Sequence, residues 1–165
     1  MQFNNIHDPK FFNNNKIWQQ ENETIRVRGN IRIPKNVTIP YNLIIEGDLI
    51  SDCKVSFKGN LKVKGSAIIG ARNTLDKSIV CQKELILLDK VRVNNCIDSE
   101  ERIFIKNLKV GVDPFGGGIA SSKTIYLEGV QGQQKVYSKE QIHTVESIEN
   151  KIPEKLKQII GVIAS

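Results

Sequence analysis

The sequence predicts a mainly β protein, a triangular single-stranded parallel β-helix of about 18 residues per coil followed by a C-terminal helical tail. Three observations predict this fold. Between Ile25 and about Ile105 the chain forms 14 consecutive hexads, with an apolar first residue in 13 and an apolar third residue in 12. Gly, Asn, Asp or Ser occupies position five or six in most hexads, where the chain must turn. Aromatic residues are only 6% of the chain, which favours a narrow core of stacked aliphatic side chains.

The hexad predicts the register of the coils. Its first and third residues lie two apart, so both side chains point to the same side of a short strand. Three strands and three corners close one coil, and residues 18 apart then stack above one another. The expected inward columns are Ile25, Leu43, Leu61, Ile79 and Ile97; Ile31, Leu49, Ala67, Leu85 and Ile103; and Val37, Val55, Asn73 and Val91.

Asn73 is the polar exception in these columns. A buried amide without partners would cost roughly 2 kcal/mol or more. We therefore expect the Asn73 side chain to bond to corner backbone or to a water molecule.

The N-terminal and central regions differ in composition. Residues 1–23 form a polar, partly mobile arm, and residues 24–137 form the solenoid domain. A loop at 113–118 interrupts the repeat before it resumes with Ile119 and Ile125. The apolar residues of the arm could cap the first coil, touch a membrane surface or dock a partner: Phe3, Phe11, Phe12, Ile17 and Trp18.

Residues 138–165 are predicted to be a helical segment that packs on the solenoid. Apolar residues at Ile142, Val145 and Ile148 have helical spacing after a capping-box pattern at Ser138 and Gln141. A second helix is expected to begin near Pro153 and to carry Leu156, Ile159, Ile160 and Ile163 on its apolar face.

One outer face carries an apolar stripe. The second hexad position points outward, and on this face it places four large apolar side chains in vertical register, with a fifth beside them: Ile50, Ile68, Ile86, Phe104 and Leu88. Soluble monomers rarely leave such a patch bare. We expect the tail to cover it by packing against 49–54, 67–72 and 85–90, with a partner subunit or an ordinary exposed strand surface as the alternatives.

Charge and cysteine content bear on partners and compartment. The net charge of +6 permits an anionic partner, but basic residues alternate with Glu and Asp along the sequence, so no specific nucleic-acid binding is expected. The three cysteines lack metal-ligand spacing and indicate reduced thiols: Cys53, Cys81 and Cys96. No signal peptide and no apolar run of the roughly 18 residues that span a bilayer is present. We expect a cytoplasmic protein, with the arm as the segment that would associate with a membrane.

Hexapeptide repeats also occur in acyltransferases, which use a histidine as general base. This chain offers only His7 in the arm and His143 in the tail. Its glycines, such as Gly47 and Gly59, fall at position five beside two large inward residues, unlike the repeat of those enzymes. We expect no catalytic residue, no cofactor and no metal, and keep a degenerate acyltransferase as the less favoured alternative.

The stretch from Leu43 to Leu88 resembles the bactofilins, polymer-forming cytoskeletal proteins of bacteria. The resemblance lies in apolar pairs followed by Gly-Asp, Gly-Asn or Gly-Ser, namely IEGDL at 45–49, FKGNL at 57–61 and VKGSA at 63–67, and it covers roughly residues 24–110. It implies a right-handed β-helix that polymerises end to end without nucleotide and reaches the membrane through a short N-terminal segment. The helical tail departs from this pattern.

The ends of a solenoid are its natural contacts, because they present unpaired strand edges and a section through the core. The candidates for self-association are Ile25, Val27, Ile31 and Ile33 in the first coil and Ile125 and Leu127 near the last. The sequence thus predicts a non-enzymatic scaffold that self-associates through its ends. The alternative is a β-helix binding module that recognises a protein partner.

Overall fold

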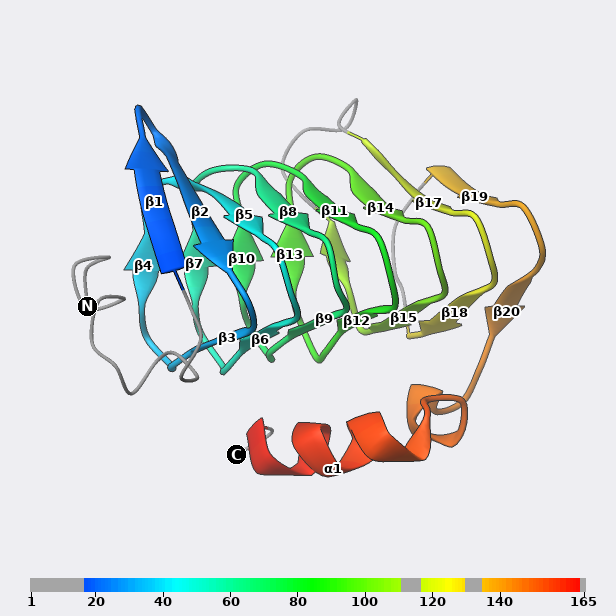
Figure 1. The fold of residues 1–165 in the computed structure, drawn as a ribbon. Coiled ribbons are helices and arrows are strands. Elements are labelled where there is room, and N and C mark those ends of the chain that lie inside the picture. The colour runs from blue at the N-terminus through cyan, green and yellow to red at the C-terminus, as the bar shows by residue number, and fades with distance from the viewer. Residues whose placement is uncertain (1–16, 111–116, 130–134, 164–165) are drawn as a thin grey trace.

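The computed structural model describes residues 17–110, 117–129 and 135–163. The chain winds into a β-solenoid of about six turns, with three sheets as its faces (Figure 1). The expected loop at 113–118, the histidine at position 7 and the arm phenylalanines lie wholly or mostly outside the described residues.

Each sheet collects one strand per coil. Sheet 1 contains β1 (Ile17–Glu21), β2 (Thr24–Arg28), β5 (Asn42–Ile45), β8 (Leu61–Val63), β11 (Ile79–Cys81), β14 (Ile97–Ser99), β17 (Gly118–Ser121) and β19 (Lys135–Ser138). Sheet 2 contains β3 (Ile31–Ile33), β6 (Leu49–Ser51), β9 (Ala67–Ile69), β12 (Leu85–Leu87), β15 (Ile103–Lys106), β18 (Ile125–Glu128) and β20 (Ile142–Thr144). Sheet 3 contains β4 (Thr38–Ile39), β7 (Ser56–Phe57), β10 (Thr74–Leu75), β13 (Arg92–Val93) and β16 (Lys109–Val110).

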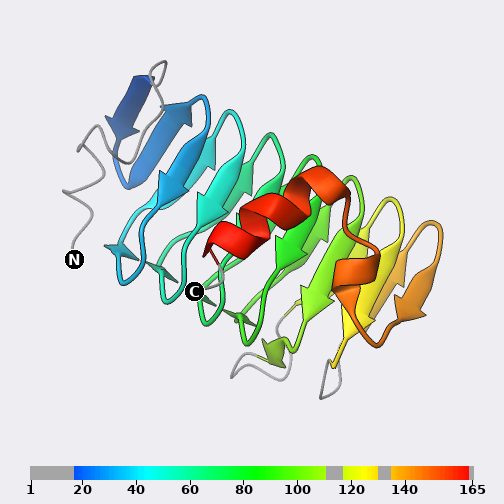
Figure 2. The ribbon, with the colours of Figure 1, turned by 90° about the horizontal axis from the view of Figure 1, so that it is seen from below.

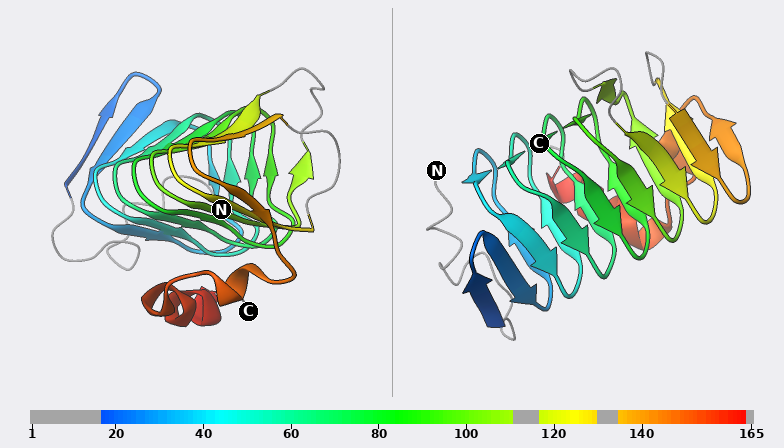
Figure 3. Two further views of the ribbon diagram at one scale, coloured as in Figure 1. Left: turned by 90° about the vertical axis from the view of Figure 1, so that its right-hand side faces the viewer. Right: turned by 90° about the horizontal axis from the view of Figure 1, so that it is seen from above.

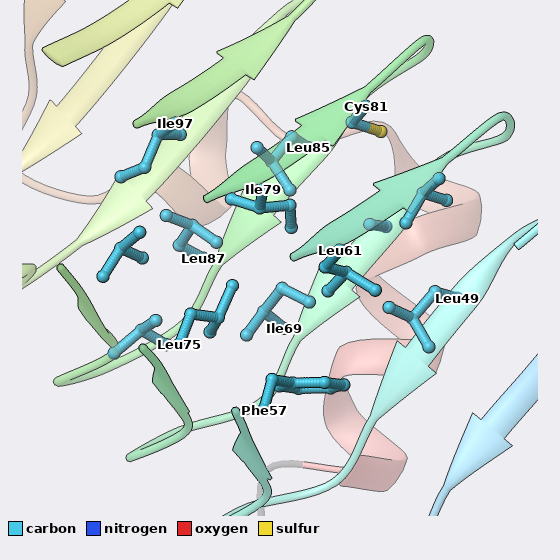
Figure 4. Close-up of a cluster of buried hydrophobic side chains, with 14 of the residues drawn as sticks. Leu49, Phe57, Leu61, Ile69, Leu75, Ile79, Cys81, Leu85, Leu87 and Ile97 are labelled. Carbon is cyan, nitrogen blue, oxygen red and sulfur yellow. The ribbon is translucent and has the colours of Figure 1, made fainter. Parts of the chain in front are cut away.

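The predicted fold class and register are confirmed. Ile25 pairs with Leu43 and Leu43 with Leu61, so residues 18 apart stack in the inward columns. These side chains are buried and form one continuous core, seen in Figure 4 for Leu61 and Ile79 among others. All strand pairs of the described residues are parallel except β1 with β2, which is antiparallel.

Asn73 is fully buried and, as expected, is bonded to corner backbone. Its Nδ2 donates to the backbone oxygen of Asp52 at 2.7 Å, and its Oδ1 accepts from Ser51 Oγ at 2.6 Å. The Ser51 hydroxyl in turn accepts from the backbone N–H of Gly70 at 3.1 Å. A short polar network therefore replaces an aliphatic contact at this level of the core.

Apart from Gly29, whose φ is 100°, the described glycines at hexad position five serve close approach between coils rather than positive φ. A Cβ on Gly47 would lie 2.5 Å from the carbonyl carbon of Gly29 in the coil below, so only glycine fits there. The left-handed corner conformation falls instead on position six, at Asn36, Lys54, Arg72, Lys90 and, one residue out of step, Asn107.

The predicted helix around residues 142–148 is wrong. Ile142 lies in β20, where it pairs with Ile125 and continues the inward column that begins at Ile31. Strand structure therefore runs past residue 137 to Thr144. The described tail is the short 3-10 helix η3 (Ile148–Asn150) and a single α-helix, α1 (Glu154–Ile163), which begins just after Pro153 as expected.

Candidate association surfaces

The C-terminal end of the solenoid is open. Ile142 continues an inward column and is 46% exposed, and Val136 of the neighbouring inward column is only half-buried, whereas the inward residues of the middle coils are buried. β19 and β20 are the last strands of sheets 1 and 2, and no other described strand pairs with their outer edges. This end thus offers apolar side chains together with unpaired backbone groups.

The N-terminal end differs. β1 occupies the outer edge of β2, while the outer edges of β3 and β4 have no partner strand among the described residues. Strand β1 belongs to the region expected to be an arm, so part of that region is ordered as a strand. The contrast between the two ends is visible in Figure 1, where β1 stands beside β2 at one end and β19 and β20 form the other.

The sequence candidates for self-association lie inside the core. Ile25, Val27, Ile31 and Ile33 are at most 2% exposed, Ile125 is fully buried, and Leu127 is half-buried against the core. A charge at these positions would disrupt packing before it affected association. The inward residues that this end presents are Val136 and Ile142, whereas Tyr137 pairs with the outward Ala120 and lies on the outer face of sheet 1. Sequence reasoning missed Ile142 because it assigned residue 142 to a helix.

The outer apolar stripe is covered by the C-terminal segment. Helix α1 lies across the outer face of sheet 2 (Figure 2). Its Ile160 is buried in a cluster with Ile68, Ile86, Leu88 and Phe104. Ile50 is only half-buried at the edge of this cluster, and η3 contributes the fully buried Ile148.

Aromatic rings extend the stripe toward the open end. Phe104 and Tyr126 stack with ring centroids 5.0 Å apart, and Tyr126 stacks on His143 at 5.5 Å. The three residues are partners in adjacent strands of sheet 2. His143 Nε2 also lies 2.8 Å from Gln141 Oε1. Because β20 is the last described strand of sheet 2, the His143 ring is the last of this aromatic stack.

Polar contacts hold the start of the tail. Glu128 Oε1 accepts a hydrogen bond from the backbone N–H of Ile148 at 3.0 Å. Lys106 Nζ lies 3.8 Å from Glu128 and 3.9 Å from Glu149, bridging β18 and η3. These contacts fix the point at which the chain leaves the solenoid and turns back along sheet 2.

A groove remains between α1 and sheet 2. It has a volume of about 420 Å³, with apolar walls from Ile50, Ile68 and Leu156. Its polar end holds Arg102, whose Nε and terminal nitrogen donate to Glu84 at 3.0 and 2.6 Å. This hydrogen bond raises the pKa of the Arg102 guanidinium.

The thiols and possible metal ligands are dispersed. The three cysteines are free, with Cys81 buried and Cys96 exposed. Burial raises the pKa of Cys81 to about 11, which keeps it protonated at neutral pH. Within the described ranges no three His, Cys, Asp or Glu side chains converge as metal ligands, and no helix there has the length and apolar character needed to cross a bilayer.

Arg26 and Glu46 form the shortest outward ion pair of sheet 1. Arg26 Nη1 lies 2.5 Å from Glu46 Oε1, and this hydrogen bond lowers the pKa of the Glu46 carboxyl. Arg28 and Lys64 approach the same carboxylate at 3.7 Å each. Three cations thus surround one carboxylate, which compensates only part of their charge at this level of sheet 1.

Comparison of the chain with known protein families, with curated proteins and with solved structures finds no match.

Proposed function

We propose that this protein is a non-enzymatic scaffold that self-associates through its C-terminal coil, as a bactofilin-like cytoskeletal element of the cytoplasm. The observation that carries the proposal is the open end at β19 and β20, where Ile142 continues a core column and is 46% exposed. An exposed strand edge beside apolar side chains is a template for pairing with another chain. The three free thiols support a reducing compartment.

The geometry of the ends favours contact between two C-terminal coils. β1 blocks the edge of β2, so stacking β19 on β2 of a second copy would first require β1 to leave. Two open coils can pair without that rearrangement, and such a contact is two-fold symmetric. Longer filaments need a second contact at the first coil, where the edges of β3 and β4 have no described partner strand.

The mass of the full chain in solution, measured at several concentrations, tests the proposal. We expect a monomer that gives way to a dimer, or to longer assemblies visible by negative-stain microscopy, as concentration rises. Ile142→Lys should weaken the association at least about tenfold, because it puts a charge into the contact from both copies. Since Ile142 is nearly half exposed, this substitution spares the core.

Val80→Lys is the matched control. Val80 is 39% exposed in β11, on the outer face of sheet 1 and away from both ends. A monomer at every concentration would disprove self-association. If both variants lost association equally, the contact would not be specific to the coil end, and the proposal would have to include the outer face of sheet 1.

The alternative role is a module that binds another protein. The groove beside α1 supports it, because its apolar walls end at the Glu84–Arg102 pair, a pattern that suits an amphipathic segment. Leu156→Asp would abolish such binding and leave assembly through Ile142 intact, so the two roles can be separated.

A further inference from the structure

The positive charge of the protein gathers on one face of the solenoid. Sheet 3 and its two corners comprise the segments 35–41, 53–59, 71–77, 89–95 and 107–110, here called the basic face. These segments contain eight Lys or Arg and two Asp. Their net charge of +6 equals that of the whole chain, so the remainder of the protein is neutral in sum.

This clustering corrects the expectation from the sequence. Basic and acidic residues alternate along the chain, but the coil period of 18 residues brings the basic ones into vertical register. Arg92 in β13 pairs with Lys109 in β16, and the corner residues Lys54, Arg72 and Lys90 lie one per coil. Neighbouring coils are about 4.8 Å apart, so these cations lie close together.

The corner column shows that backbone preference does not explain the basic residues. Lys54, Arg72 and Lys90 all have φ between 57° and 61°, a left-handed conformation that favours Asn or Gly. Asn occupies the same corner at both ends of the column, at Asn36 and Asn107. Three long basic side chains therefore stand where the backbone alone would favour a small residue.

The two acids on this face are already engaged. Asp76 lies 3.5 Å from Lys58, and Asp89 accepts a hydrogen bond from the Asn107 side chain at 2.6 Å. Lys54, Arg72 and Lys90 are exposed and form no ion pair with any carboxylate in the described part of the chain. Their charges are available to a partner.

The shape of the face favours a planar partner. β4, β7, β10 and β13 lie side by side (Figure 1), and the coils are stacked in line (Figure 3), so the face is broad and continuous. Its outward strand residues include Thr38, Ser56 and Thr74 in register. Helix α1 packs on sheet 2, and of the basic face the corner residues Arg72 and Asp89 border the pocket beside the C-terminal segment.

Among anionic macromolecules, the chemistry favours a lipid bilayer over nucleic acid. Single-stranded nucleic acid is held by exposed aromatic rings, but Phe57 points inward and Tyr41 is half-buried against the core. A bilayer needs neither stacking nor a groove, because its headgroups move to meet fixed cations. We propose that the basic face binds the surface of an anionic lipid bilayer. This differs from the expectation that the N-terminal arm carries membrane contact, and it does not depend on self-association.

Vesicle sedimentation of the full chain tests the proposal. The probe is phosphatidylcholine vesicles with about one third phosphatidylglycerol at about 0.1 M salt, compared with pure phosphatidylcholine. The triple variant Lys54→Asn, Arg72→Asn and Lys90→Asn removes three charges and installs the residue already present at Asn36 and Asn107. We expect it to lower the partition coefficient about a hundredfold.

The control triple variant removes three charges elsewhere. Lys62→Gln, Lys83→Gln and Lys139→Gln are exposed substitutions outside the basic face, and we expect less than about a fivefold effect from them. Equal losses in both triple variants, or equal binding of the wild type to both kinds of vesicle, would overturn the proposal. Tighter binding to duplex DNA than to the anionic vesicles at the same salt would also overturn it, in favour of nucleic acid. The arm is present in every sample, so binding that survives all six substitutions would assign the membrane contact to the arm instead.

Discussion

Ser51 Oγ donates a hydrogen bond of 2.6 Å to Asn73 Oδ1 inside the solenoid core. Both residues are fully buried, and each also bonds to backbone, Ser51 with Gly70 and Asn73 with Asp52. The pair occupies positions that hold aliphatic side chains in neighbouring coils, such as Val55. The core therefore tolerates polar groups where each finds a partner within it.

A double-mutant cycle tests the strength of this pair. Asn73→Val leaves the Ser51 hydroxyl proton without an acceptor and the Asp52 carbonyl without its donor, so we expect the free energy of unfolding to fall by about 2 kcal/mol. Adding Ser51→Ala should cost about 1 kcal/mol less than it does in the wild type, because its partner is already absent. Urea denaturation measures all four proteins. The partly buried Ser56–Thr74 pair, at 3.2 Å, is the control and should show a coupling below about 0.5 kcal/mol. Strict additivity at residues 51 and 73 would contradict a stabilising bond.

Removal of residues 146–165 should expose the outer stripe. The cut spares β20, whereas removal of 138–165 would also delete the last coil strand. Loss of Ile148, Ile152 and Ile160 uncovers Ile86 and Phe104, which are now fully buried. We expect a several-fold rise in the fluorescence of a hydrophobic dye, with the β-sheet circular dichroism signal kept. Unchanged dye binding in a folded truncated chain would mean that α1 is not the cover of the stripe.

Gly161→Ala should act in the opposite direction. A Cβ at residue 161 would meet no atom within 4 Å, and the residue is exposed within α1. Alanine favours helix over glycine by about 1 kcal/mol, so α1 should hold its place more firmly. We expect lower dye binding than the wild type and slower amide exchange in residues 156–161. An increase in dye binding would show that residue 161 makes a contact that needs glycine.

The left-handed backbone at the corners leads to a prediction about the free energy of unfolding that is independent of membrane binding. Arg72 has φ of 57°, so Arg72→Asn should raise the free energy of unfolding by about 0.5–1 kcal/mol. The same type of change at Lys62, in the centre of strand β8, should lower it by about 0.5 kcal/mol, because Asn is poor in strands. Thermal denaturation of both variants checks the signs. A loss of stability at residue 72 would indicate that its side chain contributes more than the corner conformation costs.

The inward columns were predictable because strand stacking repeats the same contact every 18 residues. Leu43 and Leu61 could be assigned to one column from spacing alone, and the stripe at Ile68 and Ile86 followed from the same period. Among these assignments, the secondary structure was wrong where helical spacing and the coil period coincide in the same residues. Ile142 and Val145 have helical spacing, but Ile142 also lies 17 residues after Ile125, and pairing with β18 prevailed over helix formation.

The candidate surfaces were less predictable, since they depend on corners and ends. Lys54 and Arg72 are 18 residues apart in the sequence, so their vertical alignment follows from the coil period. The prediction considered only the strand positions of each hexad and therefore omitted the corner residue at position six. The open end could not be foreseen either, because it depends on which coil is last. Once Ile142 is placed in a strand, its exposure follows from the absence of a described coil beyond it.

The buried thiol of Cys81 predicts a loss of stability in alkaline solution. Burial is the main cause that raises its pKa from an ordinary 9.0 to about 11, and its Sγ donates to the Gly65 carbonyl at 3.0 Å. The folded state therefore keeps the proton between these values while the unfolded chain loses it. The stabilisation is fully present below about pH 9 and is lost as pH rises through about 11, a change on the order of 2 kcal/mol.

Cys81→Val isolates this effect, because Val63 holds the same inward position one coil earlier. Urea denaturation of wild type and variant at about pH 8 and about pH 11 gives the two differences in unfolding free energy, and the wild type should lose more than the variant over that range. Cys96→Ser is the control: Cys96 is exposed, so its profile should follow that of the wild type. Parallel profiles for wild type and Cys81→Val would show that the thiol ionises as easily in the folded protein as in the unfolded chain, and that the core at this coil admits water.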